Sequence, residues 1–160
     1  MNDLEENNID RHTIQESIGK YTSHLFRSIQ IYVSKELEPY GIGSGQFPFI
    51  MRLLHCDGIK QEELASCLKY DRATITRSMN KLEEMGYVSR ERDPDDRRAY
   101  MVCLTEKGRA MEPVIKDVSS QLNDVLLRGF TEEETMSFIS MLMRTVDNIS
   151  SENEARKVMK

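Results

Sequence analysis

The fold is decided by one stretch of the chain, residues 82–108, which reads LEEMGYVSRERDPDDRRAYMVCLTEKG. Up to Gly86 the apolar residues recur at helical spacing, and this glycine follows the last of them as a helix-ending glycine does. Residues 87–92 and 99–104 are instead two short runs compatible with β-strands, and a charged, turn-rich segment separates them. The stretch therefore predicts a helix that leads into a β-hairpin with a polar tip.

Four helices are predicted up to Gly86. The first opens with a capping box at residues 13–16 and is stopped at Pro39, and the second carries Pro48 in its first turn, where a lost N–H donor costs little. The fourth begins after Asp71, a good N-cap residue. Their expected ranges are 13–39, 44–58, 61–68 and 71–86.

Helix is predicted to resume after the hairpin. One helix starts at Thr105, is kinked at Pro113 and carries an apolar face as far as Leu126. A second capping box at residues 131–134 opens a last helix whose inward positions are Met136, Ile139, Leu142, Met143, Val146 and Ile149. The polar segment that follows is expected to be a flexible tail.

This order of elements is typical of a winged helix-turn-helix, in which one helix lies in the DNA major groove and a hairpin flanks it. The fold class is mostly α with a small β-hairpin (α+β). The first helix and the last two have longer apolar stripes than one small winged helix can cover, which favours dimerisation. The expected divisions are a dimerisation helix over 1–40, the DNA-binding domain over 41–104, dimerisation helices over 105–150 and a tail over 151–160.

The fourth helix carries the candidate recognition residues. At about 100° per residue, Ile75, Met79 and Leu82 form a narrow core stripe. Hydroxyl, amide and guanidinium groups away from this stripe can contact bases and phosphates, whereas an ordinary solvated face more often carries Glu and Lys pairs. The candidate DNA contacts of this helix are Arg72, Ala73, Thr74, Thr76, Arg77, Asn80 and Lys81.

The hairpin tip carries a second set of candidate DNA contacts. Arginine on a projecting hairpin can enter the narrow minor groove or bind phosphate, and Asp96 could pair with Arg98 and orient it. The alternative is a solvated turn without function. The candidate residues of the hairpin are Arg90, Arg92, Asp96, Arg97 and Arg98.

The net charge of the whole chain argues against a nucleic-acid partner, because the 160 residues carry a formal net charge of −5. Residues 69–109, however, hold ten Lys and Arg against eight Asp and Glu, a net of +2, whereas the other 119 residues hold twelve basic and nineteen acidic ones, a net of −7. The acidity therefore lies outside the candidate DNA-binding segment. No apolar run is long enough to span a membrane and the N-terminus is unlike a signal peptide, so we expect a cytoplasmic protein with no membrane partner.

Three motifs in this order resemble the signature of the MarR family of transcriptional regulators. They are residues 82–88 (LEEMGYV), 92–98 (RDPDDRR) and 104–108 (LTEKG), and the likeness extends roughly from Ile14 to Ile149. Residues 43–45 (GSG) depart from it, because the family often has a Thr-Pro type cap there. The resemblance implies a homodimer whose N- and C-terminal helices interlock, and a pseudo-palindromic double-stranded DNA operator with half-sites about 10 base pairs apart.

The resemblance also implies control by an effector, often a small aromatic anion bound between the dimer helices and the winged helix. The candidate pocket residues, which could equally be ordinary core or interface, are Tyr21, His24, Arg27, Tyr32, Phe47, Met51, Arg52 and His55. Cysteine oxidation is an alternative switch, with Cys56 at a helix end, Cys67 near the core side of its helix and Cys103 on a hairpin strand. The three histidines show no metal-ligand spacing, so neither a metal nor another cofactor is expected.

These observations predict a sequence-specific DNA-binding regulator, most simply a ligand-responsive repressor. A redox-responsive regulator and a winged-helix module that binds proteins and not DNA remain alternatives. No phosphate-binding loop, metal motif or nucleophile motif supports an enzyme.

Overall fold

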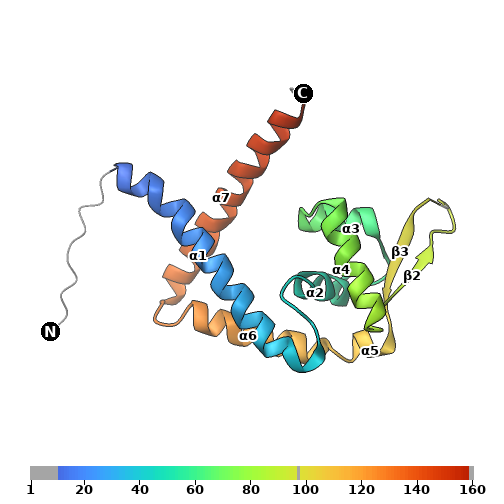
Figure 1. Cartoon of the computed structure of the whole chain (residues 1–160). Helices are drawn as coiled ribbons and strands as arrows, with labels where there is room; N and C mark the ends of the chain where they lie inside the picture. Colours follow the sequence, from blue (N-terminus) through green and yellow to red (C-terminus); the bar gives the residue numbers. More distant parts are fainter. Residues whose placement is uncertain (1–10, 97, 159–160) are drawn as a thin grey trace. The chain divides into compact units, whose positions relative to one another are not determined.

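The computed structural model of the chain describes residues 11–96 and 98–158, with side chains over residues 17–96 and 98–156 (Figure 1). The chain divides into two compact units, one ending at Leu122 and one beginning at Asn123. The elements in order are α1 (Arg11–Leu37), a 3₁₀ turn η1 (Glu38–Tyr40), α2 (Phe47–His55), β1 (Ile59–Lys60), α3 (Gln61–Leu68), α4 (Arg72–Glu84), β2 (Val88–Arg92), β3 (Tyr100–Leu104), α5 (Glu106–Arg109), α6 (Glu112–Leu126) and α7 (Glu132–Val158). This is the mostly helical fold with a small β-hairpin that the sequence predicts.

Local signals place several helix ends as expected. The third helix matches its predicted range, and α2 has Pro48 in its first turn. At the start of α7, Thr131 Oγ1 accepts a hydrogen bond from the N–H of Glu134 at 3.2 Å, and the Glu134 carboxylate accepts one from the N–H of Thr131 at 2.8 Å. The capping box at residues 131–134 is therefore confirmed, whereas the side chains of the box at 13–16 lie outside the described residues.

The sheet has one strand more than the sequence predicts. The strands are antiparallel in the order β1-β3-β2, with Ile59 opposite Val102 and Val88 opposite Leu104. With only two residues, β1 is too short to show a period of its own. Strands β2 and β3 with the turn between them form the wing, which Figure 1 shows extending past α3 and α4.

The segment that follows β3 packs closely against the end of α4. Thr105 Oγ1 donates a hydrogen bond to the Gly86 carbonyl at 2.6 Å and accepts one from the N–H of Gly108 at 3.1 Å. A Cβ atom on Gly108 would overlap the carbonyl oxygen of Tyr87. Only a glycine at this position lets α5 approach the start of β2 so closely.

The core of the first unit is continuous from α1 to α6. The last two turns of α1 bury Val33 and Leu37, and these residues belong to the same cluster as Phe49 of α2, Met79 of α4 and Ile115 of α6. The C-terminal part of α1 is therefore anchored to the helix-turn-helix by apolar packing.

Three expectations for the long helices need correction. The predicted kink at Pro113 is a break at residues 110–111, because Thr105 caps a separate short α5 and Pro113 lies in the first turn of α6, where its missing N–H is not needed. Helix α7 continues to Val158 in place of a flexible tail from Ser150. No glycine or proline interrupts residues 151–158, and Glu152 pairs with Arg156 one turn later at 2.7 Å.

The third correction concerns burial. The α7 residues predicted to face inward are exposed in the single chain, with exposed fractions from 43% for Ile139 to 66% for Met136. On α1, Ile18 and Tyr21 are likewise more than half exposed, at 58% and 64%. The periodicity identified the apolar faces, and their side chains are exposed in the part of the chain that the structure describes.

We expect Gly108→Ala to lower the free energy of unfolding by about 3 kcal/mol, because the added methyl group must push α5 away from the Tyr87 carbonyl. Chemical denaturation of the purified variant measures this loss. Gly45→Ala is the matched control, since a Cβ atom there meets nothing within 4 Å. Equal stability of the two variants would contradict the assigned role of Gly108.

Candidate nucleic-acid interface

Helix α4 is held at its start by the predicted N-cap. Asp71 Oδ1 accepts a hydrogen bond from the N–H of Thr74 and Oδ2 accepts one from its hydroxyl, both at 2.8 Å. These bonds favour the charged carboxylate and lower the pKa of Asp71. The opposite side of the helix buries Ile75, Met79 and Leu82, as the projection predicts.

The predicted recognition residues are accessible on the remaining surface of α4. All are exposed except Thr74, which is half-buried. The Thr74 hydroxyl also accepts a hydrogen bond from the guanidinium of Arg77 at 3.2 Å, so the N-cap orients this arginine. The residues concerned are Arg72, Ala73, Thr74, Thr76, Arg77, Asn80 and Lys81.

Helix α3 contributes two residues that the sequence did not single out. Glu62 pairs with Arg72 at 2.7 Å, and both side chains are exposed. Gln61 Nε2 lies 3.4 Å from Thr76 Oγ1, whose proton goes to the Arg72 carbonyl at 2.7 Å. These contacts join α3 to α4 across sequence separations of ten and fifteen residues, which no local motif signals.

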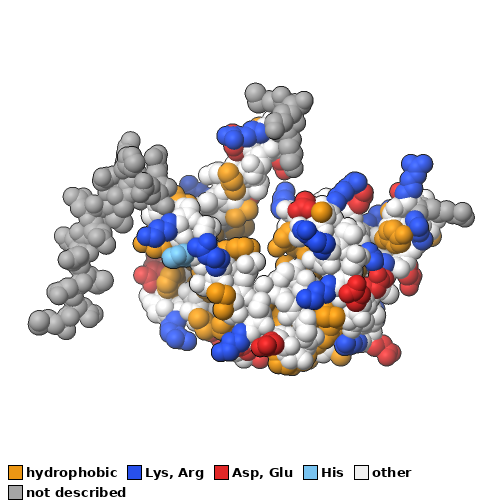
Figure 2. Space-filling model, in the orientation of Figure 1, with side chains coloured by type: hydrophobic (Ala, Val, Ile, Leu, Met, Phe, Trp, Pro, Cys, Tyr) orange, Lys and Arg blue, Asp and Glu red, His pale blue; other side chains and the backbone are white. Residues whose placement is uncertain are grey.

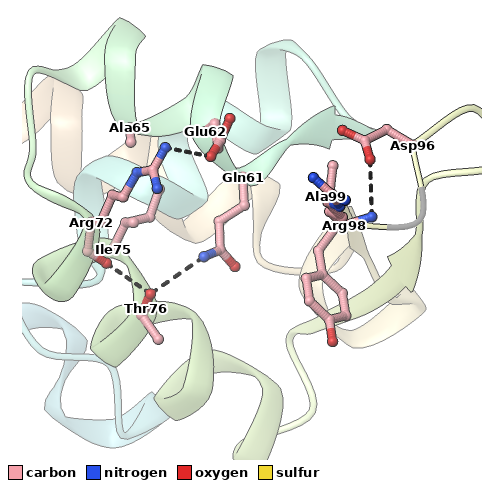
Figure 3. A pocket seen from close by; sticks show the side chains of 10 residues that line it. Gln61, Glu62, Ala65, Arg72, Ile75, Thr76, Asp96, Arg98 and Ala99 are labelled. Carbon is pink, nitrogen blue, oxygen red and sulfur yellow. Dashed lines mark hydrogen bonds and ion pairs between the residues drawn. The ribbon is translucent and has the colours of Figure 1, made fainter.

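A hollow of about 230 Å³ separates α4 from the wing (Figure 3). Figure 3 shows Gln61 between Thr76 on one side and Arg98 with the aromatic ring below it on the other. The hollow thus has guanidinium, amide and hydroxyl donors around it. Its lining residues are Gln61, Glu62, Ala65, Arg72, Ile75, Thr76, Asp96, Arg98, Ala99 and Tyr100.

The arginines of the wing have different surroundings. The guanidinium of Arg92 lies over the ring of Tyr100 at 4.5 Å, and Arg98 is exposed at the edge of the hollow. Asp96 accepts a hydrogen bond from the backbone N–H of Arg98 at 3.0 Å. The expected pairing of Asp96 with the Arg98 side chain is thus replaced by a contact that fixes the backbone. Arg97 lies outside the described residues.

Arg90 has a structural role that the sequence analysis missed. Its Nε donates to the carboxylate of Glu83 at 3.0 Å, and the side chain is only 21% exposed. Because this guanidinium is engaged by α4, it braces β2 against the helix and does not extend toward the tip. The structure thus gives Arg90 a partner within the protein, and its assignment as a DNA contact stays a prediction.

The candidate effector residues do not gather in either of the two hollows described for this chain. Tyr21, His24, Arg27 and His55 are exposed, Tyr32, Met51 and Arg52 are half-buried, and Phe47 belongs to the core. One contact joins two of them, between His55 Nδ1 and the Met51 carbonyl at 2.7 Å. A pocket made of these residues remains a prediction.

The cysteines differ in their surroundings. Burial raises the pKa of Cys103, which disfavours the reactive thiolate. Cys56 is exposed, and Cys67 is exposed too, which corrects its expected place near the core. Within residues 11–96 and 98–158, no cluster of three metal-ligating side chains occurs, and no helix is long and apolar enough to cross a membrane.

A capped outer helix, a short helix packed against it and a two-stranded wing define the class of winged helix-turn-helix proteins. A family model described as MarR family matches residues 44–100. Together with the relatives described next, this match shows that the chain belongs to the MarR family and is a MarR-family transcriptional regulator.

Similar proteins cover more than four fifths of the chain. The uncharacterized HTH-type transcriptional regulator YybA of Bacillus subtilis is 30% identical over 81% of this chain and 87% of its own length. The crystal structure of a MarR transcriptional regulator from Methanosarcina mazei Go1 is 46% identical, with a TM-score of 0.80 over 85% of this chain and 98% of that one. A Listeria monocytogenes regulator complexed with 26mer DNA is 29% identical, with a TM-score of 0.73 over 86% and 89%.

We expect the stabilising effect of the Asp71 cap to depend on pH. Because folding lowers the pKa of this carboxyl below its ordinary value of 3.8, the cap stabilises the protein above that value and loses its effect as the pH falls through the folded-state pKa. The stability difference between the parent and Asp71→Ala, followed by thermal unfolding, should shrink from about pH 7 to about pH 3. A difference that stays constant over this range would contradict the assignment.

Proposed function

We propose that this chain is a sequence-specific DNA-binding regulator that acts as a homodimer, with α4 in the major groove and the wing at the adjacent minor groove. The observation that carries the proposal is the exposed outer face of α4, where Arg72, Arg77, Asn80 and Lys81 are accessible beside the donor-lined hollow. Figure 2 shows Lys and Arg side chains over this part of the molecule, mixed with acidic ones. The DNA complex of the Listeria monocytogenes relative supports the same partner.

The hollow fits a path for one DNA strand. A sugar-phosphate strand separates the major groove from the minor groove, so a protein that enters both grooves must leave room for it between the two elements. Arg98 and Gln61 border the space between α4 and the wing, and their N–H groups suit phosphate oxygens. On this proposal Gln61 and Tyr100 join the DNA-contacting residues.

A second copy of the chain is the proposed cover for the apolar faces of α1 and α7. The large apolar side chains that α7 exposes are Met136, Ile139, Met141, Leu142, Met143, Val146 and Ile149, too many for a helix that stays in water. A two-fold dimer would bury one such face against its symmetry copy and present two α4 helices to a pseudo-palindromic site. Repression relieved by a small effector is part of the proposal on the family resemblance alone.

Selection of duplexes from a random pool, followed by footprinting, tests the proposal. We expect two protected half-sites about 10 base pairs apart and an affinity that falls steeply with salt. Failure to enrich any sequence would overturn sequence-specific binding and favour the protein-interaction alternative.

Arg77→Ala and Arg98→Ala should each weaken binding to the selected duplex by about 10- to 100-fold, since each removes a guanidinium from the proposed interface of both subunits. Fluorescence anisotropy measures the loss, and Arg156→Ala is the control because this exposed arginine lies at the far end of α7. Unchanged affinity of both variants would refute this arrangement of the contacts.

The double substitution Ile139→Glu and Val146→Glu should convert the dimer into a monomer, because four buried carboxylates would face an apolar interface. Sedimentation velocity measures the change in mass, and affinity for the selected duplex should fall by at least about 100-fold as the two heads separate. Ser137→Glu, an exposed position on the other side of α7, is the control. A double variant that stays dimeric would place the interface elsewhere.

A further inference from the structure

Asp93 organises the turn of the wing from within. It directly follows β2, and its side chain is 3% exposed. Its Oδ1 accepts hydrogen bonds from the N–H groups of Asp95 at 2.8 Å and Asp96 at 3.2 Å, while its own N–H donates to the Ala99 carbonyl at 3.1 Å. The carboxylate therefore closes the turn on one side and has its second oxygen left for another partner.

That partner is Lys60, the last residue of β1. Lys60 Nζ lies 2.6 Å from Asp93 Oδ2, and the lysine side chain is 46% exposed. The contact lowers the pKa of Asp93, which two backbone N–H groups lower further, and it raises the pKa of Lys60. Both groups are held in their charged forms.

Lys60 lies at the end of β1, where its ion pair with Asp93 can support the wing. Lys60 is the last residue of β1, lies opposite Met101 in the sheet and immediately precedes α3. Beyond this register β2 and β3 have one further pair, Arg92 opposite Tyr100, and the turn of the wing follows it without a third described strand beside it. A two-stranded ribbon alone is only marginally stable and twists easily. The contact from Lys60 to Asp93 therefore supports the hairpin just past the point where β1 ends.

We propose that the Lys60–Asp93 ion pair is a positioning device that fixes the direction of the wing relative to α3 and α4, so that both elements reach their grooves together. This inference rests on the proposed function and deepens it. Neither side chain contacts DNA. Both act through the placement of Arg98 and of the backbone around it.

A direct electrostatic effect of either residue on DNA predicts different results from a positioning role. If Lys60 bound a phosphate directly, its loss would lower the slope of log K against log salt by about one per subunit. If Asp93 only repelled DNA, Asp93→Asn would tighten binding. The positioning role predicts weaker binding for both substitutions with an unchanged salt slope.

The experiment compares Lys60→Met and Asp93→Asn with the parent on the duplex that the parent selects. We expect each variant to bind roughly tenfold more weakly. Hydroxyl-radical protection should be lost in the minor groove where the wing lies, while dimethyl sulfate protection under α4 persists. Lys60→Arg, which keeps the charge, should restore most of the affinity.

Lys116→Met is the matched control. It breaks an ion pair with Glu112 of the same length, 2.6 Å, on the exposed surface of α6, and should leave affinity within about twofold of the parent. Tighter binding by Asp93→Asn, or a reduced salt slope for Lys60→Met with the wing footprint intact, would overturn the proposal.

A measurement on the free protein separates this inference from the proposed function. Amide hydrogen exchange at Asp93, Asp95 and Asp96 should become faster in Lys60→Met, because the buried carboxylate must reorient to reach water. Exchange rates equal to those of the parent would overturn the positioning role even if the parent selects a duplex. A parent that selects none, with faster exchange in the variant, would refute DNA binding and leave the wing support standing.

Discussion

The structure depends most on the contact between Gly108 and the carbonyl of Tyr87. It lets the chain that leaves the wing pack directly against the end of α4, where Thr105 binds the Gly86 carbonyl and Lys107 Nζ donates to the Met85 carbonyl at 2.7 Å. Helix α4 and both ends of the wing are therefore fixed at one point. Any larger residue than glycine at position 108 would separate them.

The supports of the wing show which parts of the site the sequence could predict. Asp71, Gly86 and the box at 131–134 act on residues two to four positions away, so the local pattern was enough to place them. The contacts of Arg90 with Glu83 and of Lys60 with Asp93 join residues seven and thirty-three positions apart. These contacts form only when β2 packs along α4 and β1 joins the sheet. From the sequence alone, arginine and aspartate on the hairpin are therefore equally compatible with contacts to DNA.

The long helices show a different limit of sequence analysis. Periodicity identified an apolar face on α7, yet Ile139 and Val146 are 43% and 56% exposed in the chain described. A hydrophobic pattern indicates that a surface is buried away from water, but it does not identify the molecule that covers this surface. The expectation of inward-facing residues was thus correct in chemistry and wrong for a single chain.

The net charge of −5 has a mechanistic consequence once the contacts are known. In the segment with a net charge of +2, Arg90 is paired with Glu83 and Arg72 with Glu62, and Lys60, which lies outside this segment, is paired with Asp93 inside it. On the proposed function, these ion pairs reduce the positive charge that is available to phosphates. Affinity then depends on how accurately the remaining groups are placed, and internal ion pairs that lower the available charge raise that accuracy. On the proposed function, a winged helix built in this way favours geometric selectivity over non-specific binding.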